Sequence, residues 1–239
     1  MSADPLVQVT GLRKAFGTTL VLDGLSLDVR AGEAVALLGA NGAGKTTLLK
    51  ILATLARPSR GRATVAGFDC VREAEQVRRR IGLVAHGPYV YEELSALENL
   101  AFWTTLAGVA TDRTGLRAAL AEVELDSVFA ERVRAFSAGM KRRLSLARLV
   151  LLRPRVLLLD EPFAGLDQRA RKWLEGYLEG FKAGGGAILM VTHSFSRELG
   201  LADRIAILAG GRVALDAPRR SLGPEEIQRM YTLHTEEAS

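Results

Sequence analysis

The first part of the chain carries short apolar bursts separated by turn residues. The bursts lie at residues 6–9, 19–22 and 25–29, with turn signals at Gly11, Gly17 and Asp23-Gly24. Short stretches in which apolar and polar positions alternate are typical of half-buried strands. This pattern predicts a small antiparallel sheet within residues 5–30.

The pattern changes at residue 34, where Ala34 to Leu38 form a continuous apolar run. Such a run is typical of a strand that is buried on both faces. Further strand-like segments follow at residues 63–65, 81–84, 156–159, 187–191 and 204–208, and helical patterns at residues 45–55, 168–182 and 196–201. Strands that alternate with helices predict an α/β fold whose core sheet is mainly parallel.

Residues 92–152 are mostly helical in pattern and contain no short buried strand. Because strands resume at residue 156, this region is interpreted as an insertion and not as a separable domain. We therefore predict one domain over residues 1–239. Its core would comprise residues 1–86 and 153–239, and residues 87–152 would form an inserted α-helical subdomain.

Composition and charge restrict the possible partners. The formal net charge of +5 predicts an anionic neighbour, such as a nucleotide, a nucleic acid or a membrane surface. Few aromatic residues are interleaved with the basic runs, which argues against single-stranded nucleic acid, and no nucleic-acid partner is expected. The single cysteine, Cys70, cannot form an internal disulfide and fits a reducing compartment.

Neither a secretory signal nor a membrane-spanning helix is expected. The first residues lack a basic region followed by an apolar one. The most apolar stretch, residues 144–159, is interrupted by three arginines, which would be costly at the centre of a bilayer. If the protein works at a membrane, it would dock on a partner.

A phosphate-binding motif follows the first buried strand. Residues 39–46, Gly-Ala-Asn-Gly-Ala-Gly-Lys-Thr, match G-x-x-x-x-G-K-[ST] and open a predicted helix. Glycines let successive N–H groups point at phosphate oxygens, and the helix N-terminus adds partial positive charge. Lys45 would bridge the terminal phosphates and Thr46 would ligate Mg²⁺. The alternative is a glycine-rich turn that contains Lys-Thr by chance, and the motif alone leaves GTPases, kinases and recombinases open.

Two adjacent carboxylates end the apolar run at residues 156–159. The strand would place Asp160 at the carboxyl edge of the sheet, where it can hold the Mg²⁺ shell. Glu161 would then orient or deprotonate the attacking water as a general base. The alternative is an ordinary transition from strand to loop with surface acids.

With Phe136-Ser137-Ala138-Gly139-Met140 upstream of this pair, the chain resembles the ABC ATPases over essentially its whole length. This segment is similar to the family signature, although Ala138 replaces its first glycine and Met140 its glutamine. Ser137 can cap the helix that begins here, so that the helix start faces an anion. In the family that anion is the γ-phosphate of an ATP held by the opposite subunit. The alternative is a plain helix cap.

The resemblance implies roles for further residues. Asp167 would lie in the D-loop, which crosses the dimer interface, and His193 would be the switch histidine at the γ-phosphate. Phe16 would stack on adenine. The alternative for His193 is a structural histidine at the end of a strand. The alternative for Phe16 is a half-buried core phenylalanine. The expected ATP contacts are Phe16, Asn41, Gly42, Gly44, Lys45, Thr46, Thr47, Ser137, Gly139 and Asp167.

His86 is the clearest departure from the family pattern. It stands where the family has the Q-loop glutamine, which touches Mg²⁺ and water and senses the membrane partner. A neutral imidazole could still act as a ligand beside Thr46 and Asp160. Because histidine titrates near pH 6.5, we predict that activity depends on its protonation.

Residues 86–100 are similar to ABC ATPases of the haem-exporter type associated with cytochrome c maturation, and related motifs occur in drug and polysaccharide exporters. The resemblance implies an ATPase with Mg²⁺ as cofactor, peripheral on the cytoplasmic face of the inner or cell membrane. It would work as a homodimer or with a paired ATPase subunit, and would drive a membrane-spanning partner. A soluble ABC ATPase, for example in iron–sulfur assembly, stays open as an alternative.

Overall fold

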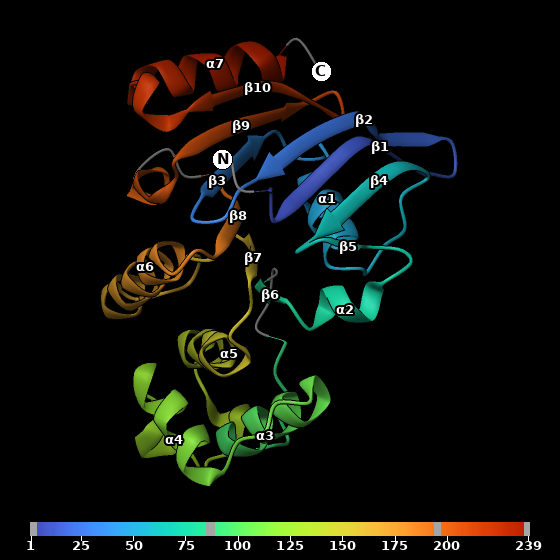
Figure 1. Ribbon diagram of the computed structural model, residues 1–239. Coiled ribbons are helices and arrows are strands. Elements are labelled where there is room, and N and C mark those ends of the chain that lie inside the picture. Colours follow the sequence, from blue (N-terminus) through green and yellow to red (C-terminus); the bar gives the residue numbers. More distant parts are fainter. Residues whose placement is uncertain (1–3, 85–88, 194–196, 237–239) are drawn as a thin grey trace. The chain divides into compact units, whose positions relative to one another are not determined.

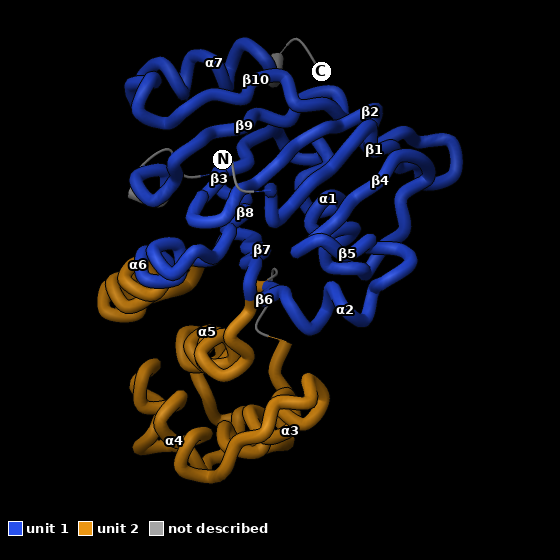
Figure 2. Tube along the Cα trace, viewed as in Figure 1, with its two compact units in different colours: residues 1–83, 155–162, 178–239 blue, residues 84–154, 163–177 orange. Residues whose placement is uncertain are grey.

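The computed structural model describes residues 4–84, 89–193 and 197–236, which fall into two compact units (Figure 2). We call residues 1–83, 155–162 and 178–239 the core unit, and residues 84–154 and 163–177 the helical unit. Each unit is considered by itself. Residues 163–177 group with the helical unit, whereas the sequence pattern placed them in the core. The single-domain organisation over residues 1–239 stays a prediction.

The predicted antiparallel sheet belongs to the core unit and has the strand order β2-β1-β4-β5 (Figure 1). The strands are β1 (Val7–Phe16), β2 (Thr19–Val29), β4 (Arg60–Val65) and β5 (Phe68–Asp69). Asp23-Gly24 was predicted to be a turn, but the structure has one strand there. Gly24 has a φ of +77° and lies within β2, beside a shift in the register between β1 and β2. The two residues bend the strand instead of ending it.

The second sheet has six strands in the order β10-β9-β3-β8-β7-β6. They are β3 (Ala34–Gly39), β6 (Ile81–Val84), β7 (Val156–Asp160), β8 (Ala187–Val191), β9 (Arg204–Ala209) and β10 (Arg212–Pro218). The pairs β3–β8, β3–β9 and β7–β8 are parallel, which confirms the predicted mainly parallel sheet. The antiparallel edge strand β10 was not predicted. No residue of β10 is fully buried, so it lacks the apolar run that marks the inner strands.

Strand β3 shows why these runs are apolar throughout. Val35 and Leu37 pack into a cluster that includes helix α1 (Lys45–Leu52), whereas Ala36 and Leu38 pack into a second cluster that includes helix α7 (Pro224–Glu236). Because successive side chains point to opposite faces, both faces of the strand are covered. The strand that leads into the phosphate loop is thus anchored from two sides.

The helices differ from the predictions at their ends. Helix α1 was expected to reach Leu55 but ends at Leu52, because Thr54 takes a left-handed conformation with a φ of +63°. Residues 196–201 were expected to be helical, and the structure has a short 3₁₀ helix at Arg197–Leu201, with Ser196 outside the described residues. Helices α2 (Ala74–Arg78) and α7 were not predicted, whereas α6 (Gln168–Ala183) confirms the predicted helix.

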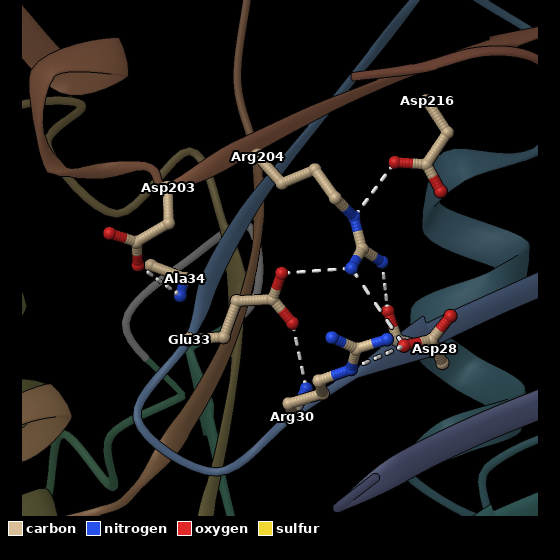
Figure 3. A network of polar contacts seen from close by, with 7 residues as sticks. All are labelled: Asp28, Arg30, Glu33, Ala34, Asp203, Arg204 and Asp216. Carbon is tan, nitrogen blue, oxygen red and sulfur yellow. Dashed lines mark hydrogen bonds and ion pairs between the residues drawn. The ribbon is translucent and has the colours of Figure 1, made fainter. Parts of the chain in front are cut away.

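Arg204 links the two sheets of the core unit (Figure 3). Its guanidinium contacts Glu33 at 2.8 Å and Asp216 at 2.7 Å, and it also donates to the main-chain oxygen of Asp28. The carboxylate of Asp203 accepts from the amide of Ala34 at 2.9 Å. The start of β3 is therefore tied to the start of β9, and Arg204 extends the network to β10 and β2.

The helical unit contains α3 (Ala96–Ala107), α4 (Arg113–Glu122) and α5 (Ala138–Leu152), with 3₁₀ turns at Asp126–Val128 and Val133–Ala135. Another 3₁₀ turn, Arg219–Ser221, belongs to the core unit. Helix α3 begins with a full capping box between Ser95 and Glu98, and α4 begins at the cap Asp112. In the part of the chain that the structure describes, no helix is long and apolar enough to cross a membrane.

Candidate functional site

The phosphate loop connects β3 to α1 in the core unit. Gly42 and Gly44 have φ angles of +83° and +104°, which side-chain-bearing residues rarely adopt. A Cβ at Gly39 would lie 2.4 Å from the main-chain oxygen of Leu208 in β9. The motif therefore needs glycine for two reasons: the curl of the loop and the close approach of the neighbouring strand.

Lys45 lies inside this loop. Its ammonium group donates to the main-chain oxygens of Gly39 at 2.5 Å and Ala40 at 2.8 Å, and the side chain is buried. Burial lowers the pKa of Lys45, and the negative charge of Asp160 opposes that shift. The cation is thus held at the loop, where it can reach phosphate oxygens.

Thr46 and Asp160 come together from two elements. The Thr46 hydroxyl at the start of α1 donates to the Asp160 carboxylate at the end of β7, at 3.2 Å. Hydroxyl and carboxylate oxygens are ligands that Mg²⁺ prefers, with the remaining positions left to phosphate and water. Among the described residues, no group of three or more His, Cys, Asp or Glu side chains could hold a metal by itself. The pair fits a Mg²⁺ site that the nucleotide and water complete.

Glu161 and His193 lie at the same carboxyl edge of the sheet. Glu161 has a φ of +47°, and its amide donates to the main-chain oxygen of Val191 at 3.0 Å. The His193 Nε2 lies 3.8 Å from the Glu161 Oε1. Burial lowers the pKa of His193, Lys45 lowers it further and Asp160 opposes both shifts. These shifts favour the neutral imidazole, which can both accept and donate a hydrogen bond.

Phe16 ends strand β1 and is 54% exposed. The Lys14 ammonium group lies 4.6 Å from the centre of its ring. The alternative of a half-buried core phenylalanine does not fit, because the ring is outside the buried clusters. Its exposed face is available for stacking on a flat ring.

The other candidate residues belong to the helical unit. Ser137 caps α5 and accepts from the amide of Met140 at 3.2 Å, and Asp167 caps α6 by accepting from the amide of Ala170 at 2.8 Å. A Cβ at Gly139 would lie 3.7 Å from the main-chain oxygen of Gly165. The signature segment and the segment before α6 are thus neighbours within this unit.

The structure brings together Lys45, Thr46, Asp160, Glu161 and His193 within the core unit, and places Ser137, Gly139 and Asp167 in the helical unit. Asn41 and Gly42 are exposed at the loop and Thr47 is half-buried. His86 lies outside the described residues. The functional assignments of all these residues stay predictions.

Asn99 was missed by the sequence reasoning. This fully buried side chain accepts from the amide of Tyr91 at 2.8 Å and donates to the main-chain oxygens of Tyr91 and Ser95, each at 2.9 Å. It therefore fixes the segment that follows the His86 region. An asparagine in the first turn of a helix with a capping box was the available signal, because that position can bond to the preceding loop.

Comparison with known proteins places the chain in a family. The model of the family described as "ABC transporter" matches residues 22–164. A daunorubicin resistance ATP-binding protein of Streptomyces coeruleorubidus is 40% identical over 93% of this chain and 71% of that protein. A doxorubicin resistance ATP-binding protein of Mycobacterium tuberculosis is 38% identical over 92% of this chain and 67% of that protein.

Solved structures agree on the fold. The ATP-binding subunit of an ABC transporter superimposes with a TM-score of 0.85, at 31% identity and over 96% of this chain and 94% of that one. A dimeric ATP-binding cassette in a post-hydrolysis state with ADP and Pi superimposes with a TM-score of 0.80 at 23% identity, over 90% of this chain and 99% of that one, which shows a shared fold. The chain belongs to the ATP-binding, ATP-hydrolysing subunits of the ABC transporter family.

Proposed function

We propose that this ATPase works as a head-to-tail pair, in which each ATP is held by the core unit of one subunit and by the signature segment of the other. The contact that supports ATP binding by the core unit is the pair Thr46–Asp160 beside the buried cation Lys45. It brings a hydroxyl, a carboxylate and an ammonium group to one loop, as a metal-bound triphosphate requires.

Within the core unit, the loop amides from Asn41 to Thr47 would surround the phosphates and Lys45 would contact their terminal oxygens. Thr46 and Asp160 would hold Mg²⁺, which neutralises charge that develops on the phosphates. Glu161 would orient the attacking water and take its proton. The neutral imidazole of His193 would contact the γ-phosphate, and Phe16 would stack on adenine.

The helical unit would supply the second half of the site. Ser137 is exposed and its hydroxyl stands at the start of α5, a helix of 15 residues. A helix start presents N–H groups and partial positive charge, both of which suit a phosphate. Gly139 allows close approach of that phosphate, and Asp167 would lie near the interface between the two subunits.

An aromatic patch of the helical unit supports a membrane-spanning partner. Tyr91 and Phe102 form an edge-to-face pair with ring centres 4.8 Å apart, and they are 50% and 41% exposed. Leu106, one turn further along α3, is 77% exposed. Exposed apolar clusters of this kind mark interaction surfaces. We place the protein peripherally on the cytoplasmic face of the membrane, with this patch toward its partner.

For the transported substance, the two relatives named above carry daunorubicin and doxorubicin resistance in their names, and we propose an export role of this kind. Neither relative favours the alternative of a soluble assembly ATPase. The similarity of residues 86–100 to haem-exporter ATPases stays a second candidate. Transport assays with the membrane partner, using an anthracycline and haem as competing substrates, distinguish the two.

The role of Glu161 is tested by Glu161→Gln. The variant keeps the size of the side chain and removes the base, so we expect ATP binding as in the wild type, a stable ATP-bound dimer and hydrolysis slowed by about 100-fold or more. The matched control is Glu225→Gln, an exposed acid in the first turn of α7. Full turnover by Glu161→Gln would remove Glu161 from the role of base.

The role of His86 is tested by His86→Gln, which restores the glutamine of the family pattern. We expect a changed ATPase rate and a flatter dependence of that rate on pH between about 5.5 and 7.5, because a group titrating near pH 6.5 is gone. If both the rate and the pH profile match the wild type, His86 has no such role.

A further inference from the structure

Strand β2 lies against the phosphate loop in the core unit. A Cβ at Gly44 would lie 2.6 Å from a methyl carbon of Leu22 and 3.0 Å from the main-chain oxygen of Val21. Leu22 is fully buried. The strand that pairs with the Phe16 strand is thus in direct contact with the residue that precedes Lys45.

The turn between β9 and β10 touches the same residues of β2. Gly211 has a φ of +73°, and a Cβ there would lie 2.8 Å from the main-chain oxygen of Val21. The amide of Asp23 donates to the main-chain oxygen of Gly211 at 3.0 Å. Residues 21–23 of β2 therefore have the phosphate loop and this turn as close neighbours, and the carbonyl oxygen of Val21 leaves no room for a side chain at either Gly44 or Gly211.

Two ion pairs meet at Asp23 of β2. The Asp23 carboxylate contacts Arg212 of β10 at 2.5 Å and Arg13 of β1 at 3.1 Å. Arg13 is on β1, the strand that ends at Phe16, and lies opposite Asp23 of β2 in the β1–β2 register. We call Arg13, Asp23 and Arg212 the clasp.

We propose that the clasp positions the Phe16 end of the β1–β2 pair relative to the phosphate loop, and so sets the affinity for the nucleoside part of ATP. The clasp residues are positioning residues, because they act through Phe16 and the strand. This inference rests on the proposed function, in which Phe16 stacks on adenine.

Two features give the clasp this ability. The hairpin end that carries Phe16 and Thr19 has an irregular register, with a shift between Lys14 and Ala15. The hydrogen bonds between β1 and β2 therefore do not by themselves fix the position of this end. The clasp joins β1, β2 and β10, and so connects this end of the antiparallel sheet to the edge of the sheet that carries the loop.

Asp23→Asn is the first test, because it removes the charge and keeps the shape of the side chain. The affinities of ATP and of inorganic triphosphate, each with Mg²⁺, are measured by calorimetry. We expect the dissociation constant of ATP to rise about three- to tenfold, since exposed ion pairs contribute modestly. Triphosphate uses the phosphate loop alone, so its affinity stays within about twofold of the wild type.

Arg212→Gln provides a second variant, because the side chain is 64% exposed, so we expect its replacement to leave the fold intact. This variant loses only the ion pair between Arg212 and Asp23, so we expect the dissociation constant of ATP to rise less than it does in Asp23→Asn. The matched control is Asp126→Asn in the helical unit, which breaks a comparable exposed pair with Arg117 at 2.7 Å. This control should change neither affinity.

The outcomes separate the inference from the proposed function. If the wild type binds neither ATP nor triphosphate, the proposed function fails. Suppose instead that the wild type binds both ligands, and that Asp23→Asn and Arg212→Gln bind ATP as tightly as the wild type does. The proposed role of the clasp is then overturned, and the proposed function stands. Equal losses for ATP and triphosphate would also overturn the clasp, because they indicate a general disturbance of the loop.

Discussion

The two units of the molecule are stabilised in different ways. In the core unit, strands β3, β7 and β8 are buried along their whole length, and glycines let backbones approach closely. In the helical unit, exposed side-chain pairs join the elements, for example Lys141–Glu92 at 2.5 Å and Arg117–Asp126 at 2.7 Å. Close backbone fit thus distinguishes the core unit, whereas the helical unit adds helix caps and side-chain pairs to its buried residues, such as Leu100 and Leu120.

This difference corresponds to the two halves of the proposed ATP site. Lys45 and Asp160 are buried in the core unit, at 6% and 7% exposure, so the phosphate side is organised before any ligand arrives. Ser137 and Asp167 in the helical unit are exposed and cap helices. Exposed groups of this kind suit a site that a second subunit completes. The comparison leads to four stability predictions.

The largest effect is expected for Gly61→Ala in the core unit. A Cβ there would lie 2.4 Å from the main-chain oxygen of Gly11, and the φ of Gly61 is +81°. We expect a loss of about 2 to 4 kcal/mol, from strain and overpacking together, measured by urea unfolding. Gly67→Ala is the matched control: its φ is +86° but no atom lies within 4 Å, so it should lose only about 1 kcal/mol. Equal losses would show that backbone fit is not the cause.

A smaller effect is expected for Ser95→Ala at the start of α3 in the helical unit. The hydroxyl accepts from the amide of Glu98 at 3.2 Å, and its removal leaves a helix-start amide without that partner. We expect a loss of about 1 kcal/mol in urea unfolding followed by helix circular dichroism. Ser127→Ala, at an exposed position of the same unit, should stay within about 0.5 kcal/mol of the wild type. No loss at Ser95 would argue against caps as a main source of stability.

Gly176→Ala in α6 should stabilise the protein. No atom lies within 4 Å of a Cβ at this position, and alanine restricts the unfolded chain. We expect a gain of about 0.5 to 1 kcal/mol, measured as a higher urea midpoint. Gly115→Ala in α4 is the control, because its Cβ would lie 2.5 Å from the Thr111 hydroxyl and should cancel much of the gain. A loss at Gly176 would contradict the view that helix propensity matters in this unit.

The smallest effect concerns pH. The main-chain and side-chain bonds from Ser95 hold the pKa of Glu98 below its ordinary value. A lowered pKa in the folded state means that Glu98 contributes stability above the pKa of the unfolded chain. That contribution is lost as the pH falls through the folded-state value. We therefore expect the stability difference between the wild type and Glu98→Gln to shrink on acidification from neutral pH to about pH 3. A constant difference would show that the charge contributes nothing.

Much of the fold could be predicted because the signals are local. The continuous apolar run at residues 187–191 predicted β8, because a strand that is buried on both faces is apolar at every position. The helical spacing of apolar residues over 168–182 predicted α6, because a helix that is buried on one face repeats its apolar positions every three to four residues. The edge strand β10 and helix α7 were missed. Residues of β10 are at most partly buried, so their pattern is weak.

The candidate site could be predicted in part for the same reason. The phosphate loop and the Asp160-Glu161 pair each follow a buried strand, and the contact between Thr46 and Asp160 agrees with that placement. The sequence could not show that Phe16 is exposed, or that Asn99 binds the loop before its own helix. Both depend on how the strands and helices pack, which periodicity does not specify.

By itself, the sequence determined the α/β architecture and predicted the phosphate loop, the acidic pair and the signature segment, because each of these signals lies in residues that are close together along the chain. Only the tertiary structure decided what fixes the loop in place. Arg212 contacts Asp23 across 189 positions of the chain, and Arg204 contacts Glu33 across 171. Contacts between residues so far apart arise when sheets pair and pack, and no local pattern of apolar and polar residues encodes them.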